Sequence, residues 1–309
     1  MKKMITRWLM ITILAFGAHE YALWCINDSL RQAEMIVNGT YPRPYVYRAM
    51  IPWAARFLNA LGFREDVAVI ITIIISAVGL MYAIQYLLSS FQKENKSRVF
   101  AASVLAVLAF MILFARDCKV YDLATAGFFA FGIGAMKRNK LGLFYAIFIL
   151  SSINRETTII LTVIFAIYFI KKMSITSLIL GVGFQISVFI LIRIWIAILF
   201  KDNIGVDGVI RPIENLRLYT YYPLLTFIHW GIIALVTWRI VRKWKTVPQI
   251  LRISFTILFP LLMGVYIIAG FSFETRIFAE VYPIAFNILW LPDHNIIIER
   301  DKHKIALDN

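Results

Sequence analysis

The chain has 309 residues, 61% of them hydrophobic, and a mean hydropathy of +0.75. This composition excludes an ordinary soluble domain, because such domains are about half apolar. The formal net charge of +14 comes without a soluble basic face, so it does not indicate nucleic-acid binding.

Apolar stretches of about 18 or more residues predict membrane-spanning helices. They lie near 8–26, 67–90, 99–116, 119–136, 175–200, 218–240, 250–272 and 276–291. Another apolar run, from Leu141 to Ile170, is interrupted by Asn154-Arg155-Glu156. Barrel strands are short and alternate in polarity, unlike these stretches. The predicted fold class is therefore all-α: a polytopic transmembrane helical bundle of about 9–10 membrane helices, with residues 1–309 forming a single domain.

The first apolar run follows a basic N-terminus, Met1 to Arg7, which is also typical of a signal peptide. No small-x-small cleavage site follows it, so we expect an uncleaved membrane helix. Glu20 lies about 12 residues into this helix, or roughly 18 Å at 1.5 Å per residue. His19 can share a hydrogen bond with it. A carboxylate at that depth is costly, which makes Glu20 a candidate for function.

A polar outer loop, 28–66, begins at Asp28 and separates the first two predicted spans. Its second half, 49–63, is amphipathic. Apolar residues recur there at near-helical spacing: Ile51, Ala55, Leu58 and Leu61. This pattern predicts a helix that lies in the membrane interface.

Basic residues determine the predicted topology, because short cytoplasmic loops carry an excess of Lys and Arg. The basic patches are Lys2, Lys3 and Arg7; Lys93, Lys96 and Arg98; Lys137, Arg138 and Lys140; Lys171 and Lys172; Arg239, Arg242, Lys243, Lys245 and Arg252; and Arg300, Lys302 and Lys304. A single crossing by the run from Leu141 to Ile170 would put the last three patches outside. A turn at 154–156 keeps every patch inside. We therefore predict a short helical hairpin with an outward apex, and cytoplasmic termini that include the tail 293–309.

Polar residues collect on the predicted outer face beyond the first loop. They are Asp117, Asp122, Asn154, Arg155, Glu156, Arg193, the outer loop 201–217, Glu274 and Arg276. Charged residues at membrane depth usually face a protein interior or a water-filled cavity. Their clustering on one face favours a functional site.

These clusters also have structural alternatives. Arg155 with Glu156, and likewise Glu274 with Arg276, can be ion pairs that clamp helix ends. The acids Asp117 and Asp122 can belong to a solvated turn or a helix N-cap. Aromatic residues of the first loop can form an interfacial belt: Tyr45, Tyr47 and Trp53.

Four short motifs resemble those of a family of small bacterial polytopic membrane proteins. The segment from Pro44 to Trp53 looks like their "YR-x-L-x-P" motif, and Tyr121-Asp122-Leu123-Ala124-Thr125 looks like "YDL-x-T". The segment Asn154-Arg155-Glu156-Thr157 resembles "NRET", and Glu274-Thr275-Arg276 resembles a late "E-x-R". Those proteins are similar in layout to GT-C glycosyltransferases, which take a sugar from a polyprenyl-phosphate carrier.

The resemblance implies a glycosyltransferase at the outer face of a bacterial cytoplasmic membrane. In the GT-C superfamily a catalytic acid follows the first helix, which assigns the general base to Asp28, with Glu20 as its substitute. Arginines would bind the substrate phosphate: Arg48, Arg155 and Arg276. Other polar residues would orient them or bind sugar: Asp117, Asp122, Asn154, Glu156 and Glu274. The implied partners are membrane lipid, the lipid-linked sugar donor and a glycan or lipid acceptor.

Several alternatives stay open from the sequence. The first loop has no paired acidic motif, so we expect no metal site and no cofactor, with a divalent cation as the open alternative. A transporter or flippase of a lipid-linked or small anionic substrate is a second class of function, and a non-catalytic assembly subunit is a third. Cys25 and Cys118 can pair if their face is oxidising, but two unpaired buried thiols are the favoured interpretation.

Overall fold

A computed structural model describes residues 2–26, 30–92, 96–115, 118–205, 212–270 and 274–291. In this part of the chain there are thirteen α-helices, several short 3-10 turns and no strand. The α-helices are α1 (Lys2–Cys25), α2 (Leu30–Asn38), α3 (Met50–Ala60), α4 (Glu65–Leu88), α5 (Lys96–Phe114), α6 (Asp122–Lys137), α7 (Leu141–Asn154), α8 (Ile159–Phe169), α9 (Ile175–Leu199), α10 (Pro212–Tyr221), α11 (Pro223–Arg242), α12 (Gln249–Ile268) and α13 (Tyr282–Trp290). The 3-10 turns used below are η1 (Tyr45–Tyr47), η3 (Glu156–Thr158) and η5 (Thr275–Phe278). The all-α prediction is confirmed.

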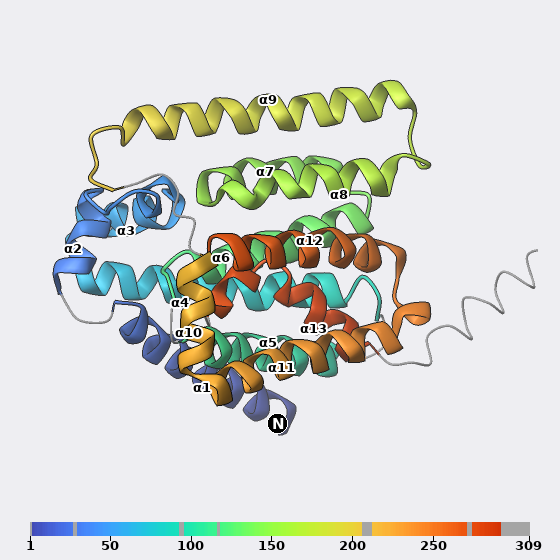
Figure 1. The fold of residues 1–309 in the computed structure, drawn as a ribbon, viewed down its shortest axis with the longest axis horizontal. Coiled ribbons are helices and arrows are strands. Elements are labelled where there is room, and N and C mark those ends of the chain that lie inside the picture. Colours follow the sequence, from blue (N-terminus) through green and yellow to red (C-terminus); the bar gives the residue numbers. More distant parts are fainter. Residues whose placement is uncertain are drawn as a thin grey trace, which may run out of the picture.

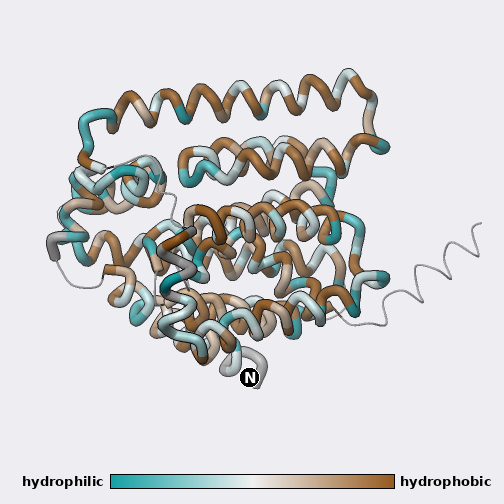
Figure 2. The backbone as a smooth tube through the Cα atoms, viewed as in Figure 1, coloured by the Kyte–Doolittle hydropathy of each residue, from teal (hydrophilic) through white to brown (hydrophobic). Residues whose placement is uncertain are grey.

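Five of these helices are long and apolar enough to cross a membrane: Thr6–Cys25, Glu65–Leu88, Lys96–Phe114, Ile175–Leu199 and Gln249–Ile268. Each matches a predicted span to within a few residues. The long helices lie side by side (Figure 1). Along them the backbone tube is mostly brown, the colour of hydrophobic residues, whereas several turns between them are teal, the colour of hydrophilic residues (Figure 2). The chain is therefore compatible with a multi-pass membrane protein.

The long helices alternate in direction, so that the connections gather at two opposite ends of the bundle (Figure 1). One end, which we call the site end, holds α2, α3, α10, the α7–α8 turn and η5. The opposite end, which we call the basic end, carries most of the described basic patches: Arg98, Lys137, Arg138, Lys140, Lys171, Lys172, Arg242, Lys243 and Lys245. The predicted tail 293–309 lies outside the described residues.

The predicted hairpin turn at 154–156 is confirmed. Helix α7 ends at Asn154 because Arg155 takes an extended conformation (φ −156°, ψ 145°), and α8 starts after η3. The two arms have 14 and 11 residues, or roughly 21 and 17 Å at 1.5 Å per residue, so neither spans the ~30 Å hydrocarbon core. Helix α9 packs across both arms at Gly181, where an added Cβ would lie 2.7 Å from the Tyr145 hydroxyl.

Three of the sequence predictions need correction. Residues 30–38 form the amphipathic helix α2, which was expected to be loop. Helix α10 crosses the predicted boundary between the loop 201–217 and the span 218–240. It is separate from α11 because Pro212 and Pro223 each begin a new helix. The predicted last span, 276–291, is η5 followed by the nine-residue α13, roughly 14 Å long.

The predicted interfacial segment 49–63 contains a helix, α3. Its Ile51 and Ala55 are buried, whereas Phe57 and Leu61 are exposed. It lies at the site end of the bundle (Figure 1).

Cys25 and Cys118 form a disulfide, with their Cα atoms 5.1 Å apart. The interpretation as unpaired thiols is therefore wrong. The bond joins the end of α1 to the segment before α6, and both lie at the site end.

Candidate functional site

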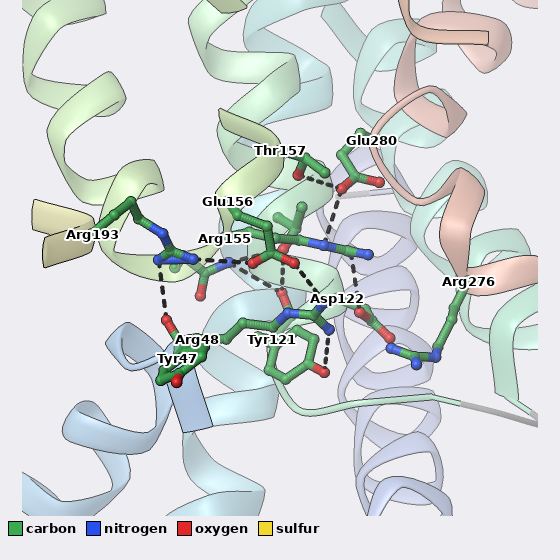
Figure 3. A network of polar contacts seen from close by, with 12 residues as sticks. Tyr47, Arg48, Tyr121, Asp122, Arg155, Glu156, Thr157, Arg193, Arg276 and Glu280 are labelled. Atoms are coloured by element: carbon green, nitrogen blue, oxygen red, sulfur yellow. Dashed lines mark hydrogen bonds and ion pairs between the residues drawn. The ribbon is translucent and has the colours of Figure 1, made fainter. Parts of the chain in front are cut away.

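Eight charged side chains from five parts of the fold lie at the site end, and Figure 3 shows all of them except Glu274. We call them the charge network: Arg48, Asp122, Arg155, Glu156, Arg193, Glu274, Arg276 and Glu280. They come from the end of η1, the start of α6, the α7–α8 turn, α9 and the region of η5. Most of them are buried, which is rare for charged residues unless they are paired.

Glu156 bridges two arginines. Its Oε1 atom accepts from Arg48 Nη2 at 2.8 Å, and its Oε2 atom accepts from Arg193 Nη2 at 3.0 Å. Arg193 also donates from Nη1 to the carbonyls of Tyr47 and Ser152, both at 3.1 Å. These bonds tie η1, the hairpin turn and α9 together, so the Glu156 carboxylate is the joint between three elements.

Arg48 is buried and remains positively charged. Its Nη1 donates to the Tyr121 hydroxyl at 2.5 Å, and its Cζ lies 4.7 Å from the centre of that ring. Burial lowers the pKa of Arg48, but Glu156, Tyr121 and Asp122 together outweigh it and raise the pKa well above its ordinary value. Arg48 is therefore a permanent cation at the edge of the aromatic pocket described below.

Arg155 lies between two fully buried carboxylates. Its Nη1 is 3.5 Å from Asp122 Oδ1, and its Nε is 3.1 Å from Glu280 Oε1. Asp122 also accepts from the backbone N–H of Lys119 at 2.9 Å, and Glu280 from the Thr157 hydroxyl at 2.7 Å. One guanidinium cannot neutralise two acids, and burial raises the pKa of Glu280.

The structure brings most of the predicted site residues together. Six of them belong to the charge network: Arg48, Asp122, Arg155, Glu156, Glu274 and Arg276. Asn154 is next to it, donating to the Thr125 hydroxyl at 2.8 Å. Arg276 forms an ion pair with Glu274, as one structural alternative predicted. Arg155 and Glu156, the other predicted pair, have different partners.

The two candidates for the general base are not placed in the charge network. Asp28 lies outside the described residues, as does Asp117. Glu20 is 47% exposed and contacts its neighbour His19, with Nδ1 and Oε1 3.2 Å apart. Both assignments stay predictions.

Sequence reasoning missed Glu280, which it placed inside an apolar span. The rule that singled out Arg155 also applies to Glu280, since a carboxylate within an apolar run marks a buried partner. Arg193 was noted in the outer part of its helix but given no role. Tyr121 was part of a motif and Lys119 was the first residue of the predicted span 119–136; neither had a signal of its own.

A small aromatic pocket of about 20 Å³ opens beside Arg48. Its lining combines aromatic rings with polar and cationic groups: Gln32, Tyr41, Tyr45, Trp53, Arg56, Lys119 and Tyr121, among others. This volume holds about one water molecule, so a larger ligand would lie across the mouth of the pocket. Several of its walls are fixed, since Gln32 donates to the Tyr41 hydroxyl at 2.7 Å and Arg56 to the Val37 carbonyl at 2.7 Å.

A second cavity, of about 150 Å³, is an apolar groove formed by α5, α11, α12, η5 and α13. Among its lining residues are Leu113, Ile232, Phe259, Thr275, Phe278 and Tyr282. The turn η5 contributes to this groove and also contacts a residue of the aromatic pocket. Thr275 and Phe278 line the groove, whereas Arg276 lies 5.7 Å from the ring centre of Tyr45, which lines the aromatic pocket. The turn thus lies between the two cavities.

Over the described residues, no group of three or more His, Cys, Asp or Glu side chains is arranged to hold a metal ion. What the arrangement offers is positive charge, aromatic faces and apolar surface. It is suited to an anionic, amphipathic ligand.

Comparisons with protein-family models, with curated proteins and with solved structures find no match for this chain.

Proposed function

We propose that this protein is a GT-C-like membrane glycosyltransferase, which transfers a sugar from a polyprenyl-phosphate carrier to an acceptor hydroxyl. The observation that carries the proposal is at η5, where Thr275 and Phe278 line the apolar groove and Arg276 lies 5.7 Å from the ring centre of Tyr45 in the aromatic pocket. A lipid-linked sugar phosphate has the same three parts: a polar ring, an anion and a long apolar chain. The acceptor would be a glycan, a lipid or a cell-envelope polymer.

The orientation follows from two features. Described basic patches gather at the end opposite the site, and such patches mark the cytoplasmic side of a bilayer. The disulfide between Cys25 and Cys118 is at the site end, and disulfides persist in oxidising compartments. Both features support the proposal that the site end faces the outer side of a bacterial cytoplasmic membrane, with helix α3 in the interface.

The prenyl chain would occupy the apolar groove, since that groove adjoins Arg276 through Thr275. The segment 49–63 lines the aromatic pocket through Trp53 and Arg56, which suits the sugar better than the lipid.

In the proposed reaction the acceptor oxygen forms a bond to the anomeric carbon while the bond from that carbon to the phosphate oxygen breaks. The polyprenyl phosphate leaves with the electron pair, and a carboxylate takes the acceptor proton. Asp28 is assigned as this base, with Glu20 as the alternative. Arg48 and Arg276 would stabilise the charge that develops on the leaving phosphate, because a guanidinium matches phosphate oxygens in a bidentate contact.

The test is a transfer assay with purified protein, a radiolabelled polyprenyl-phosphate sugar and a membrane extract that supplies acceptors. We expect label to move from the carrier to an acceptor. Asp28→Asn should abolish transfer. The matched control is Asp66→Asn, which removes the acid of an ion pair with the exposed Arg64 and should leave transfer unchanged. Label that crosses a vesicle membrane while still on its carrier would indicate a flippase, and label that neither moves nor crosses would favour an assembly subunit. Either result would refute the proposal.

A further inference from the structure

The ring of Tyr45 is surrounded by three cations that come from three different parts of the chain. The ring centre is 5.5 Å from Lys119 Nζ, 5.7 Å from Arg276 Cζ and 5.8 Å from Arg48 Cζ. One cation over an aromatic face is favourable. Three cations around the same ring repel one another and create a local positive potential, which attracts anions.

The positive charge around Tyr45 is not fully matched by acids. Arg48 is paired with Glu156, and Arg276 is paired with Glu274. Lys119 has no acidic partner within the described part of the chain, and its Nζ contacts the Tyr45 ring. The cluster therefore carries an excess positive charge at Lys119.

The fold holds Lys119 in this position. Its backbone N–H donates to Asp122 Oδ2 at 2.9 Å, and its carbonyl accepts from the Asp122 N–H at 3.0 Å. The disulfide at the neighbouring Cys118 anchors the same segment to α1. Lys119 also lines the aromatic pocket, as does Tyr45.

We propose that Lys119, Arg48 and Arg276 bind a phosphate group beside the ring of Tyr45, between the aromatic pocket and the apolar groove. The inference rests on the proposed function for the identity of the molecule that carries this phosphate. It makes Lys119, which has no assigned role, the third cation of the site. It also removes Arg155 from the phosphate-binding set, because Arg155 is enclosed by Asp122 and Glu280.

The same geometry places the sugar at the mouth of the aromatic pocket. The rings of Tyr41 and Tyr45 are 5.8 Å apart, and Trp53 and Tyr121 line the same cavity. Aromatic faces pack against the apolar face of a pyranose ring, and Gln32 and Arg56 supply polar groups near it. A phosphate beside Tyr45 is therefore next to its sugar.

Binding is measured on the full-length protein in an uncharged maltoside detergent, because phospholipid headgroups would present the same phosphate chemistry. The ligands are a polyprenyl monophosphate without sugar, the matching polyprenol, and inorganic phosphate. The variants are Lys119→Met, Lys119→Arg and the control Lys140→Met, which removes an exposed lysine at the basic end.

We expect the wild type to bind the polyprenyl monophosphate at least tenfold more tightly than the polyprenol. Lys119→Met should reduce that preference about tenfold, Lys119→Arg should largely restore it, and Lys140→Met should leave it unchanged. Because the contact between the Lys119 ammonium group and the phosphate is electrostatic, the preference for polyprenyl monophosphate over polyprenol should fall as salt is added. Equal affinity of the wild type and Lys119→Met for the polyprenyl monophosphate would overturn the site.

The two proposals can fail separately. If polyprenyl monophosphate binding depends on Lys119 but the transfer assay shows no activity, the phosphate site stands and the proposed glycosyltransferase fails. If transfer proceeds at the wild-type rate in Lys119→Met, the glycosyltransferase stands and this phosphate site fails. Strong, Lys119-dependent binding of inorganic phosphate, with no gain from the lipid chain, would support the anion site and contradict a lipid-linked ligand.

Discussion

Replacing Arg155 with Met should destabilise the protein rather than weaken its binding of phosphate. The variant leaves the buried carboxylates of Asp122 and Glu280 without their shared cation. Removing one partner of a buried ion pair typically costs about 3–5 kcal/mol. Glu280 can take up a proton, because burial already raises its pKa, so we expect a loss at the low end of this range, about 3 kcal/mol.

Thermal unfolding in detergent measures this loss. At roughly 2–4 °C per kcal/mol, about 3 kcal/mol corresponds to a decrease in Tm of about 6–12 °C. The control Arg64→Met removes an arginine whose side chain is 72% exposed, and an exposed pair contributes at most about 1 kcal/mol. The triple variant Arg155→Met, Asp122→Asn, Glu280→Gln has no buried charge left at this position and should recover most of the loss. An unchanged Tm in Arg155→Met would refute the assignment of Arg155 as a structural cation.

Three further predictions address other parts of the structure. Because burial raises the pKa of Glu280 in the folded protein, its contribution to stability is complete at low pH and is lost as pH rises through that pKa. The Tm of Glu280→Gln should therefore rise relative to that of the wild type as the pH increases above about 4.5, and a constant difference would contradict this. Maleimide-polyethylene glycol should modify the denatured protein only after reduction, adding two labels, and labelling without reductant would show that Cys25 and Cys118 are not bonded. Gly181→Ala should lower Tm because its Cβ would meet Tyr145 and Phe165 at 2.7 and 3.3 Å, whereas Gly183→Ala, in the same helix with nothing within 4 Å, should not; equal effects would contradict the packing of α9 on the hairpin.

The hairpin could be predicted from the sequence because two independent signals agreed. Arg155 and Glu156 interrupt an apolar run, and only a turn there keeps the basic patches on one side. The short helices α2 and α10 could not be predicted in the same way. They have 9 and 10 residues, too few for a span, and their polar residues resemble those of a loop.

Partner choice within the charge network could not be predicted, since it depends on how distant elements pack. Arg155 and Glu156 are adjacent in the chain, and their side chains leave the turn toward different partners. Glu156 pairs with Arg48 and Arg193, which are separated from it by 108 and 37 residues. The convergence of Lys119, Arg48 and Arg276 on Tyr45 is likewise a product of the tertiary fold.

The site is tested most directly by locating the substrate. A polyprenyl-phosphate sugar with a photoreactive diazirine on the first isoprene unit, next to the phosphate, would be activated in the presence of the purified protein, and labelled peptides would be mapped by mass spectrometry. We predict adducts in residues 274–281, between the aromatic pocket and the apolar groove, and we predict that excess polyprenyl phosphate removes them while polyprenol does not. Adducts spread over the exposed apolar face of α9, with no competition by polyprenyl phosphate, would contradict the account.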